Sequence, residues 1–104
     1  MPELDPVVRA RAVAALRFRA LGDETRLLLL QLLTPGEQCV ADLMERTALG
    51  QSLVSHHLRT LRRAGLVHHR RDGRWVYYSL SDRALAATRG IISALELPPD
   101  PALE

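Results

Sequence analysis

The sequence predicts an α+β fold that is mainly helical, with five helices and one two-stranded β-hairpin. Two observations predict it. Apolar residues recur at helical spacing over most of the chain, and the period changes between residues 66 and 80, where aromatic and β-branched residues predominate. A two-stranded hairpin is not stable alone, so it must pack on the helices. A chain of 104 residues fits one domain, 1–104, with loose ends at 1–5 and 99–104.

The first helix is predicted over residues 7–21, an alanine-rich segment that ends at Gly22. Asp23 is the expected N-cap of a second helix that runs to about Leu33, because a carboxylate there accepts from the free amides of the first turn. Residues 34–36, Thr-Pro-Gly, stop this helix, since proline cannot continue it.

A helix-turn-helix is predicted next. A short third helix covers residues 40–47, Leu-Gly at 49–50 makes the turn, and a fourth helix covers residues 51–63. Gly65 closes the fourth helix in the left-handed conformation that glycine tolerates best.

The hairpin is predicted from strands at 66–70 and 74–80, with Asp-Gly at 72–73 as the turn residues. A fifth helix is expected from Asp82 to about Leu97, before two prolines stop it. The order helix, helix, helix-turn-helix, hairpin, helix is that of a winged helix-turn-helix.

The fourth helix is amphipathic. Val54, Leu58 and Leu61 recur at i, i+4 and i+7 and form its apolar face, and His57 at the edge of that face is expected to pack inside. The opposite face carries hydrogen-bonding and cationic side chains and no acidic residue. Its members are Gln51, Ser52, Ser55, His56, Arg59 and Arg63. This composition is typical of a helix that enters the DNA major groove and reads base edges.

Positive charge is concentrated in the same part of the chain. All fourteen basic residues are arginine, and residues 51–80 hold six of them with one acidic residue, a balance of +5. The rest has eight arginines and eleven acidic residues, a balance of −3. This separation favours a cationic surface for a polyanion, although charge alone also allows a solvated arginine-rich surface. Arg70, Arg71 and Arg74 of the hairpin are expected to contact phosphates or an adjacent minor groove.

From about Val13 to Leu97 the chain resembles the ArsR/SmtB repressors. The resemblance rests on five segments in the same order: 20–27 (ALGDETRL), 37–43 (EQCVADL), 51–61 (QSLVSHHLRTL), 64–67 (AGLV) and 72–80 (DGRWVYYSL). It implies a homodimer with the first and last helices at the interface. It also implies double-stranded DNA with a two-fold symmetric operator as the partner, and release of that DNA when an inducer binds.

The apolar residues of the first and last helices agree with a dimer, because they exceed what a core of this size buries. The residues expected at the interface are Val8, Ala12, Ala15, Leu16, Leu85, Ile91, Ile92 and Leu95. The alternative is that both helices only cover the core of the monomer. In a dimer, two fourth helices about 34 Å apart would match one turn of DNA.

The sequence leaves the inducer open. The family's metal-sensing pattern has a second cysteine where this chain has Ala41, so Cys39 alone cannot form the multi-thiolate site that soft metals prefer. A second family site lies on the last helix, and Asp82 matches its first ligand. The other ligand positions hold residues that cannot bind a metal: Ala84, Leu95 and Pro98.

Three alternatives remain for Cys39. It is a ligand, with Glu37 or Asp42, of a transition-metal ion that acts as inducer; or a redox or electrophile sensor; or a small buried residue without a signalling role. The third alternative corresponds to a metal-independent inducer or to constitutive DNA binding.

These observations predict a sequence-specific transcriptional repressor. Two other classes are a winged-helix protein-interaction module whose basic face meets an acidic partner, and a non-specific architectural DNA binder. An enzyme is not expected, because the sequence has no phosphate-binding glycine loop, no recognisable pair of catalytic carboxylates and no nucleophile beside a base. Apolar runs such as Leu27–Leu30 are far shorter than the roughly 20 residues that span a bilayer. The N-terminus has no apolar signal core, so a cytoplasmic protein without membrane contact is expected.

Overall fold

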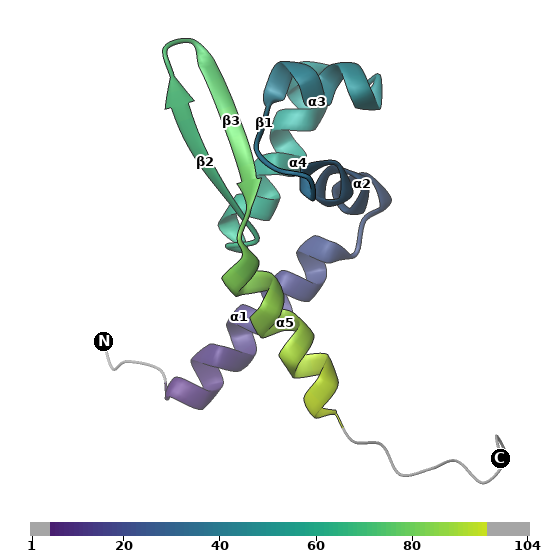
Figure 1. The fold of residues 1–104 in the computed structure, drawn as a ribbon. Coiled ribbons are helices and arrows are strands. Elements are labelled where there is room, and N and C mark those ends of the chain that lie inside the picture. Colours follow the sequence, from purple (N-terminus) through teal and green to yellow (C-terminus); the bar gives the residue numbers. More distant parts are fainter. Residues whose placement is uncertain (1–4, 96–104) are drawn as a thin grey trace, which may run out of the picture.

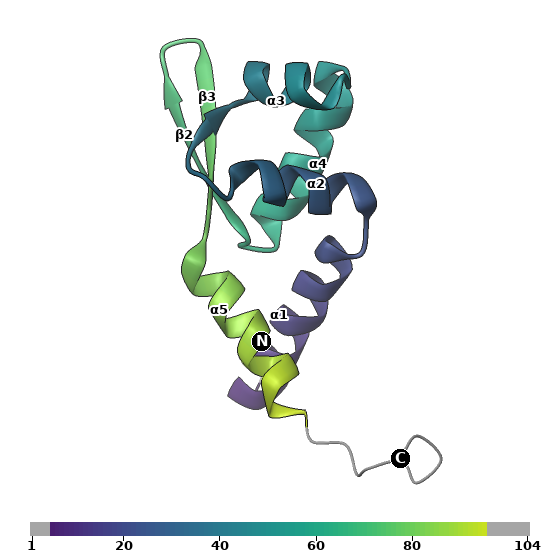
Figure 2. The ribbon, with the colours of Figure 1, turned by 45° about the vertical axis from the view of Figure 1, so that its right-hand side comes forward.

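The computed structural model describes residues 5–95 and confirms the α+β architecture. Within that range the elements are α1 (Pro6–Leu21), α2 (Glu24–Leu33), β1 (Gln38–Cys39), α3 (Val40–Thr47), α4 (Gln51–Arg63), β2 (Val67–Asp72), β3 (Trp75–Leu80) and α5 (Asp82–Ala94). The hairpin of β2 and β3 and helix α3 lie at one end of the molecule, and α1 and α5 lie side by side at the other (Figures 1 and 2). No helix of the described range is long and apolar enough to cross a membrane.

The ends of the helices follow local capping rules. Asp23 caps α2 as predicted, since its Oδ1 accepts from the Arg26 amide at 3.0 Å, and that hydrogen bond holds the pKa of this carboxyl below its ordinary value. Asp5, which we expected in a loose terminus, caps α1 by accepting from the Val7 amide at 2.8 Å. Helix α5 ends at Ala94, before the predicted Leu97, because the backbone of the next residue is extended. The remaining predicted loose residues and the two prolines lie outside the described range.

The sheet has three antiparallel strands in the order β1-β3-β2 where two were predicted. Gln38 pairs with Tyr78 and Cys39 with Tyr77, so β1 lies along the edge of β3 that is not paired with β2. Strand β1 escaped prediction because two residues are too short to show an alternating pattern. Helix α3 starts at Val40, directly after β1. The hairpin and the first helix of the helix-turn-helix are therefore joined through the sheet.

The hairpin turn lies one residue later than predicted. Asp72 pairs with Trp75 as the last pair of the ladder, which leaves Gly73 and Arg74 as the two central residues. Gly73 has φ +60°, whereas Arg74 is not among the described residues with positive φ. Glycine at the first central position is the pattern of a type II′ turn, whose twist matches that of the flanking strands.

The core lies between α2, α3, α4 and the start of β2. Its largest fully buried side chains are Leu29, Leu33, Leu43, Val54, Leu58, Leu61 and Leu66. The predicted apolar face of α4 is thus confirmed, and His57 is buried at 8% exposure, also as predicted. Gly65 has φ +76° and ends α4 as expected. Because the apolar face of α4 is fixed by the core, its polar face is turned outward.

Candidate nucleic-acid interface

The polar surface of α4 consists of two rows. Gln51, Ser55, Arg59 and Arg62 follow one another at i, i+4, i+8 and i+11, and all of them line a cleft that faces the hairpin. Ser52, His56 and Arg63 are exposed but do not line this cleft, so they form the second row. The sequence pattern predicts a single polar face without Arg62, whereas the structure divides it into two rows and adds Arg62 to the first.

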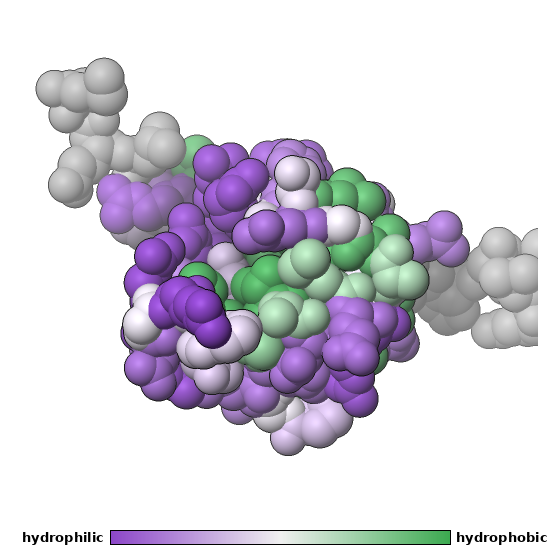
Figure 3. Space-filling model, turned by 90° about the horizontal axis from the view of Figure 1, so that it is seen from above, coloured by the Kyte–Doolittle hydropathy of each residue, from purple (hydrophilic) through white to green (hydrophobic). Residues whose placement is uncertain are grey.

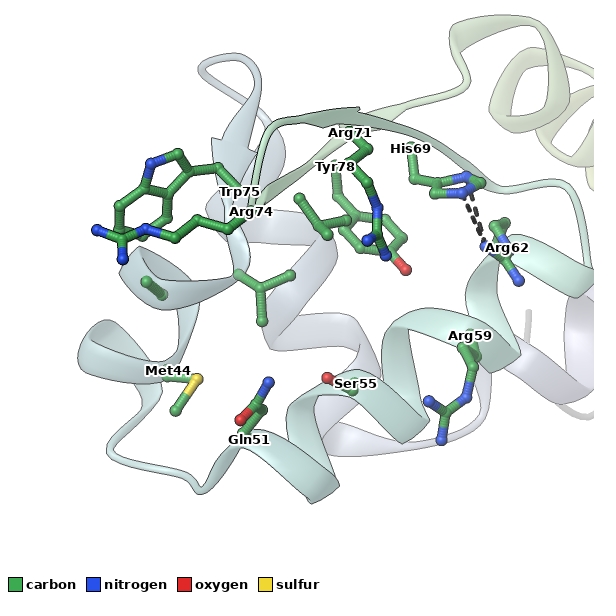
Figure 4. A pocket seen from close by; sticks show the side chains of 13 residues that line it. Met44, Gln51, Ser55, Arg59, Arg62, His69, Arg71, Arg74, Trp75 and Tyr78 are labelled. Atoms are coloured by element: carbon green, nitrogen blue, oxygen red, sulfur yellow. Dashed lines mark hydrogen bonds between the residues drawn. The ribbon is translucent and has the colours of Figure 1, made fainter.

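The cleft lies between α4, α3 and the hairpin and has a volume of about 480 Å³ (Figure 4). Its lining residues are Val40, Ala41, Met44, Gln51, Ser55, Arg59, Arg62, His69, Arg71, Arg74, Trp75, Val76 and Tyr78. Four of them are arginines, and none is acidic. Charges of one sign that converge on a concave surface raise the local concentration of counter-charged ligands. The cleft is therefore suited to an anion.

A hydrogen bond joins α4 to β2 across the cleft. Arg62 Nη1 lies 2.9 Å from His69 Nε2 (Figure 4). The His69 ring stacks on the Tyr78 ring of β3, with centroids 5.8 Å apart and an interplanar angle of 29°. The same Nη1 lies 3.5 Å from His69 Nδ1, so the guanidinium approaches both ring nitrogens.

Arg70 lies on the other face of the hairpin and has a different partner. Its Nη2 is 2.6 Å from Glu37 Oε1, and its Nε donates to Glu37 Oε2 at 2.9 Å. This pairing lowers the pKa of the Glu37 carboxyl and raises the pKa of the Arg70 guanidinium. The guanidinium also lies 4.4 Å from the centroid of the Tyr77 ring. The three hairpin arginines thus do not act as one group: Arg71 and Arg74 line the cleft, and Arg70 is bound to a carboxylate.

Not all of the surface at this end is charged. Seen from above, apolar residues form a patch surrounded by hydrophilic ones (Figure 3). Leu53 near the start of α4 and Trp75 beside the hairpin turn are each 45% exposed. Arg74 lies over the Trp75 ring, 5.1 Å from its centroid. Apolar side chains beside cationic ones suit DNA, because the thymine methyl group is an apolar contact in the major groove.

Two arginines bind backbone carbonyls and fix α4 relative to α1 and α2. Arg17 of α1 donates from Nε to the Ala64 carbonyl at the end of α4, at 3.0 Å. Arg26 of α2 donates to the Ala20 carbonyl at 2.6 Å and to His57 Nδ1 at 3.3 Å. A cation at the carbonyl end of a helix is favoured by the helix dipole. These contacts set the direction in which α4 presents its polar rows.

The residues expected at a dimer interface lie on the two helices at the opposite end. Val8, Leu16, Ile91, Ile92 and Leu95 are large apolar side chains with exposures between 37% and 67%. Ala12 is also exposed. Ala15 is half-buried, and Leu85 is half-buried against the monomer's own core. An exposed apolar surface of this kind is typical of a protein–protein interface.

Cys39 is half-buried at the N-cap position of α3 and makes no capping hydrogen bond there. Of its two suggested co-ligands, Glu37 is already paired with Arg70, and Asp42 is exposed in the first turn of α3. In the range 5–95, no three His, Cys, Asp or Glu side chains come together in a way that would hold a metal. One thiol with these neighbours does not fit a soft metal ion, which prefers several sulfur ligands.

Arg62 and His69 were not predicted as site residues, although the spacing of the sequence contains a signal for both. The row through Gln51, Ser55 and Arg59 extends at helical spacing to Arg62. The two-residue period of a strand places His69 and Arg71 on one face and Arg70 on the other. The ion pair between Arg70 and Glu37 has no such signal in the sequence, since the two residues are 33 positions apart.

Comparison with known proteins identifies a family. Residues 23–69 match the family described as "Bacterial regulatory protein, arsR family". The chain is 46% identical over 81 residues to a "Transcriptional repressor SmtB homolog" of Synechocystis sp., covering 78% of this chain and 61% of the relative. It is 43% identical over 76 residues to the "Arsenical resistance operon repressor" of Escherichia coli, covering 72% and 65%.

The fold agrees with these sequence relatives. A crystal structure of a possible transcriptional regulator for arsenical resistance has a TM-score of 0.72 to this chain at 39% identity, covering 79% of this chain and 85% of that one. The chain spans less than two thirds of the two sequence relatives but most of the structural one. The chain belongs to the arsR family of bacterial regulatory proteins.

Proposed function

We propose that the protein is a homodimeric, sequence-specific DNA-binding repressor whose α4 enters the major groove. The observation that carries this proposal is the cleft between α4 and the hairpin, which is lined by four arginines and no acidic residue. The phosphate backbone dominates the affinity of proteins for DNA, so a concave cationic surface beside a polar helix is what duplex binding requires. The relatives named as repressors support the direction of regulation.

The two rows of α4 and the hairpin make different contacts with DNA. The residues that we propose contact base edges are Gln51, Ser52, Ser55, His56, Arg59 and Arg63. Arg71 and Arg74 lie on the hairpin rather than on the base-reading helix and line the cleft, so they contact phosphates. Arg70 contributes less, since Glu37 neutralises its charge in the free protein.

The dimer is formed through α1 and α5. Their exposed apolar residues lie at the opposite end from the hairpin tip, so two copies can associate without covering either cleft (Figures 1 and 2). A two-fold symmetric dimer reads a two-fold symmetric operator, with α4 helices about 34 Å apart.

An inducer releases the protein from its operator. Relatives named for resistance to arsenic, cadmium and mercury make a metal ion a candidate class. The donors around Cys39 within one chain do not fit such an ion, so we derive no step through a metal. Substitution of Cys39 with serine separates the alternatives: unchanged release by every metal and oxidant tested would make this thiol structural.

The test is DNA binding to the protein's own upstream region at several salt concentrations. A repressor should prefer that duplex over random DNA by about 10³-fold or more. Arg59→Ala should weaken operator binding by about 1–3 kcal/mol with relaxed specificity if Arg59 reads a guanine. Arg71→Ala should weaken binding to every duplex and reduce the salt slope by about one. Arg83→Ala, an exposed arginine on α5, is the matched control.

Each contrary result indicates another class. Equal affinity for all duplexes would support an architectural DNA binder, and no DNA binding would support a protein-interaction module. Operator affinity at the level of the unmodified protein in both Arg59→Ala and Arg71→Ala would contradict the docking geometry.

A further inference from the structure

The cleft between α4 and the hairpin is not lined by cations alone. Val40 and Met44 of α3 and Val76 of β3 line it, and all three are half-buried side chains that pack against the core. Trp75 adds an aromatic ring, over which the Arg74 guanidinium lies. We call Val40, Met44, Trp75 and Val76 the apolar end of the cleft. A phosphate is bound by charge and hydrogen bonds, so these side chains do not contribute to its affinity.

Three further arginines form what we call the cationic end of the cleft: Arg59 and Arg62 of α4 and Arg71 of β2. The residues of α4 that line the cleft run from Gln51 to Arg62, which is about 16 Å along the helix. In Figure 4, Met44 lies on the side where Gln51 begins α4, and Arg59 and Arg62 lie on the other side. The cleft thus changes from apolar to cationic along its length.

The cationic end has no carboxylate partner within residues 5–95. The ion pair in this range joins Glu37 to Arg70, which lies on the opposite face of the hairpin. Arg62 contacts the His69 ring, which carries no negative charge. An incoming anion therefore displaces no carboxylate. A guanidinium can bind two oxygens of one phosphate or carboxylate in parallel, which makes arginine well suited to such groups.

We propose that the cleft binds a small amphipathic anion, and that this ligand is an inducer that competes directly with DNA. Its phosphate, sulfate or carboxylate head contacts the cationic end, and its short aliphatic or aromatic body packs against the apolar end. The volume of the cleft, about 480 Å³, lies within the roughly 300–1,000 Å³ of small-molecule sites. Such sites combine apolar walls with a few convergent polar groups, and this cleft has that composition.

Competition follows from the position of the ligand. Gln51, Ser55 and Arg59, which we propose contact base edges, line the same cleft, so a bound ligand covers the residues that the duplex needs. Release of DNA then requires no movement of α4 and no metal. The inducer role rests on the proposed function, whereas binding of the ligand requires only the cleft.

The first experiment measures ligand binding without DNA. The probe is hexyl phosphate, which joins an anionic head to a short apolar chain, and inorganic phosphate and hexanol supply the two halves separately. Trp75 is the only tryptophan of the chain and lines the cleft, so its fluorescence reports occupancy. Hexyl phosphate should change this emission saturably, with an affinity at least about tenfold above that of either half at equal ionic strength, because only the whole molecule contacts both ends. No saturable change, or equal affinity for hexyl phosphate and inorganic phosphate, would overturn the proposal.

Variants at each end test the assigned contacts. Arg71→Gln removes a cation from the cationic end, and Met44→Gln places a polar group in the apolar end; each should weaken hexyl phosphate binding about tenfold. Arg70→Gln, on the opposite face of β2, and Leu53→Gln, an exposed apolar residue of α4 outside the cleft, are the matched controls and should leave the affinity unchanged. Arg71 is exposed, so its replacement does not disturb the core. Full affinity in Arg71→Gln would contradict the site, as would losses in the controls equal to those in the two test variants.

The second experiment measures fluorescence anisotropy of the upstream duplex with increasing hexyl phosphate at constant ionic strength. Hexyl phosphate at ten times its own Kd should weaken DNA binding about tenfold, because one site cannot hold both ligands. Inorganic phosphate at the same concentration should have little effect. Full DNA affinity at saturating hexyl phosphate would overturn the inducer role. The two proposals fail in different ways: a protein that binds hexyl phosphate at the cleft but prefers no duplex would contradict the sequence-specific repressor and leave the ligand site standing.

Discussion

The Arg26 guanidinium connects α2, which carries it, to α1 and α4. Arg26→Met removes the guanidinium and leaves an unbranched apolar side chain in its place. The guanidinium donates to the Ala20 carbonyl at 2.6 Å, to the Arg19 carbonyl at 3.3 Å and to His57 Nδ1 at 3.3 Å. Ala20 and His57 are both buried, with exposures of 2% and 8%. Water therefore has little access to the groups that lose their donor.

The expected loss follows from these contacts. A hydrogen bond to a charged group contributes about 1.5–3 kcal/mol to stability, and an unsatisfied buried polar atom costs about 1–3 kcal/mol. The 2.6 Å bond and the buried His57 nitrogen dominate, and the bond to the exposed Arg19 carbonyl adds little. We expect Arg26→Met to lower the free energy of unfolding by about 3 kcal/mol, a large share of the roughly 5–15 kcal/mol that domains possess.

Urea unfolding followed by circular dichroism measures this quantity. All samples need one protein concentration, because the stability of a dimer depends on it. Arg83→Met is the matched control, since it removes an exposed arginine from the first turn of α5. A loss below about 1 kcal/mol, or one equal to that of the control, would show that Arg26 does not fix α4.

Two further predictions concern the core and the hairpin. Leu58→Ala should destabilise the fold by about 2–5 kcal/mol in the same assay, because the side chain is fully buried. Leu53→Ala should lower the free energy of unfolding much less, because that side chain is 45% exposed. Equal losses would contradict the assigned faces of α4. Because pairing with Arg70 lowers the folded-state pKa of Glu37, the ion pair should stabilise the fold above the ordinary pKa of a glutamate and be lost as the pH falls through the lowered value. NMR of the Glu37 carboxyl carbon during acid titration checks this, and titration at the ordinary glutamate value would refute it.

Helix α4 was predictable because its local pattern and its tertiary environment agree. Val54, Leu58 and Leu61 lie at helical spacing, and the fold buries all three. Strand β1 could not be predicted, because its two residues become a strand only by pairing with β3, which is a non-local interaction. The turn moved by one residue for a similar reason: the Asp-Gly pair suggests a turn, but the register of the ladder places Asp72 in the last pair.

The residue types of the candidate site could be predicted from the sequence, but the separation of Arg70 from the arginines of the cleft could not. Arginine content and the absence of acidic residues pointed to α4 and the hairpin, and the structure brings Arg59, Arg71 and Arg74 to one cleft. The separate role of Arg70 depends on Glu37, which lies 33 positions earlier and reaches it only in the folded chain. Such pairings are set by topology, so no local pattern could have revealed them.

The arginine contacts also bear on how a distant event could reach DNA. Arg17 lies on α1, which we place in the dimer interface, and its Nε donates to the Ala64 carbonyl at the end of α4 at 3.0 Å. Arg26 binds the Ala20 carbonyl at the C-terminal end of α1 and the buried His57 of α4. A shift of α1 must either break these bonds, at about 1.5–3 kcal/mol for each charged donor, or carry α4 with it. Moving α1, α2 and α4 together as one rigid body breaks none of these three contacts. A rearrangement at the α1–α5 end would therefore change the separation of the two α4 helices, the distance that an operator of fixed helical repeat requires.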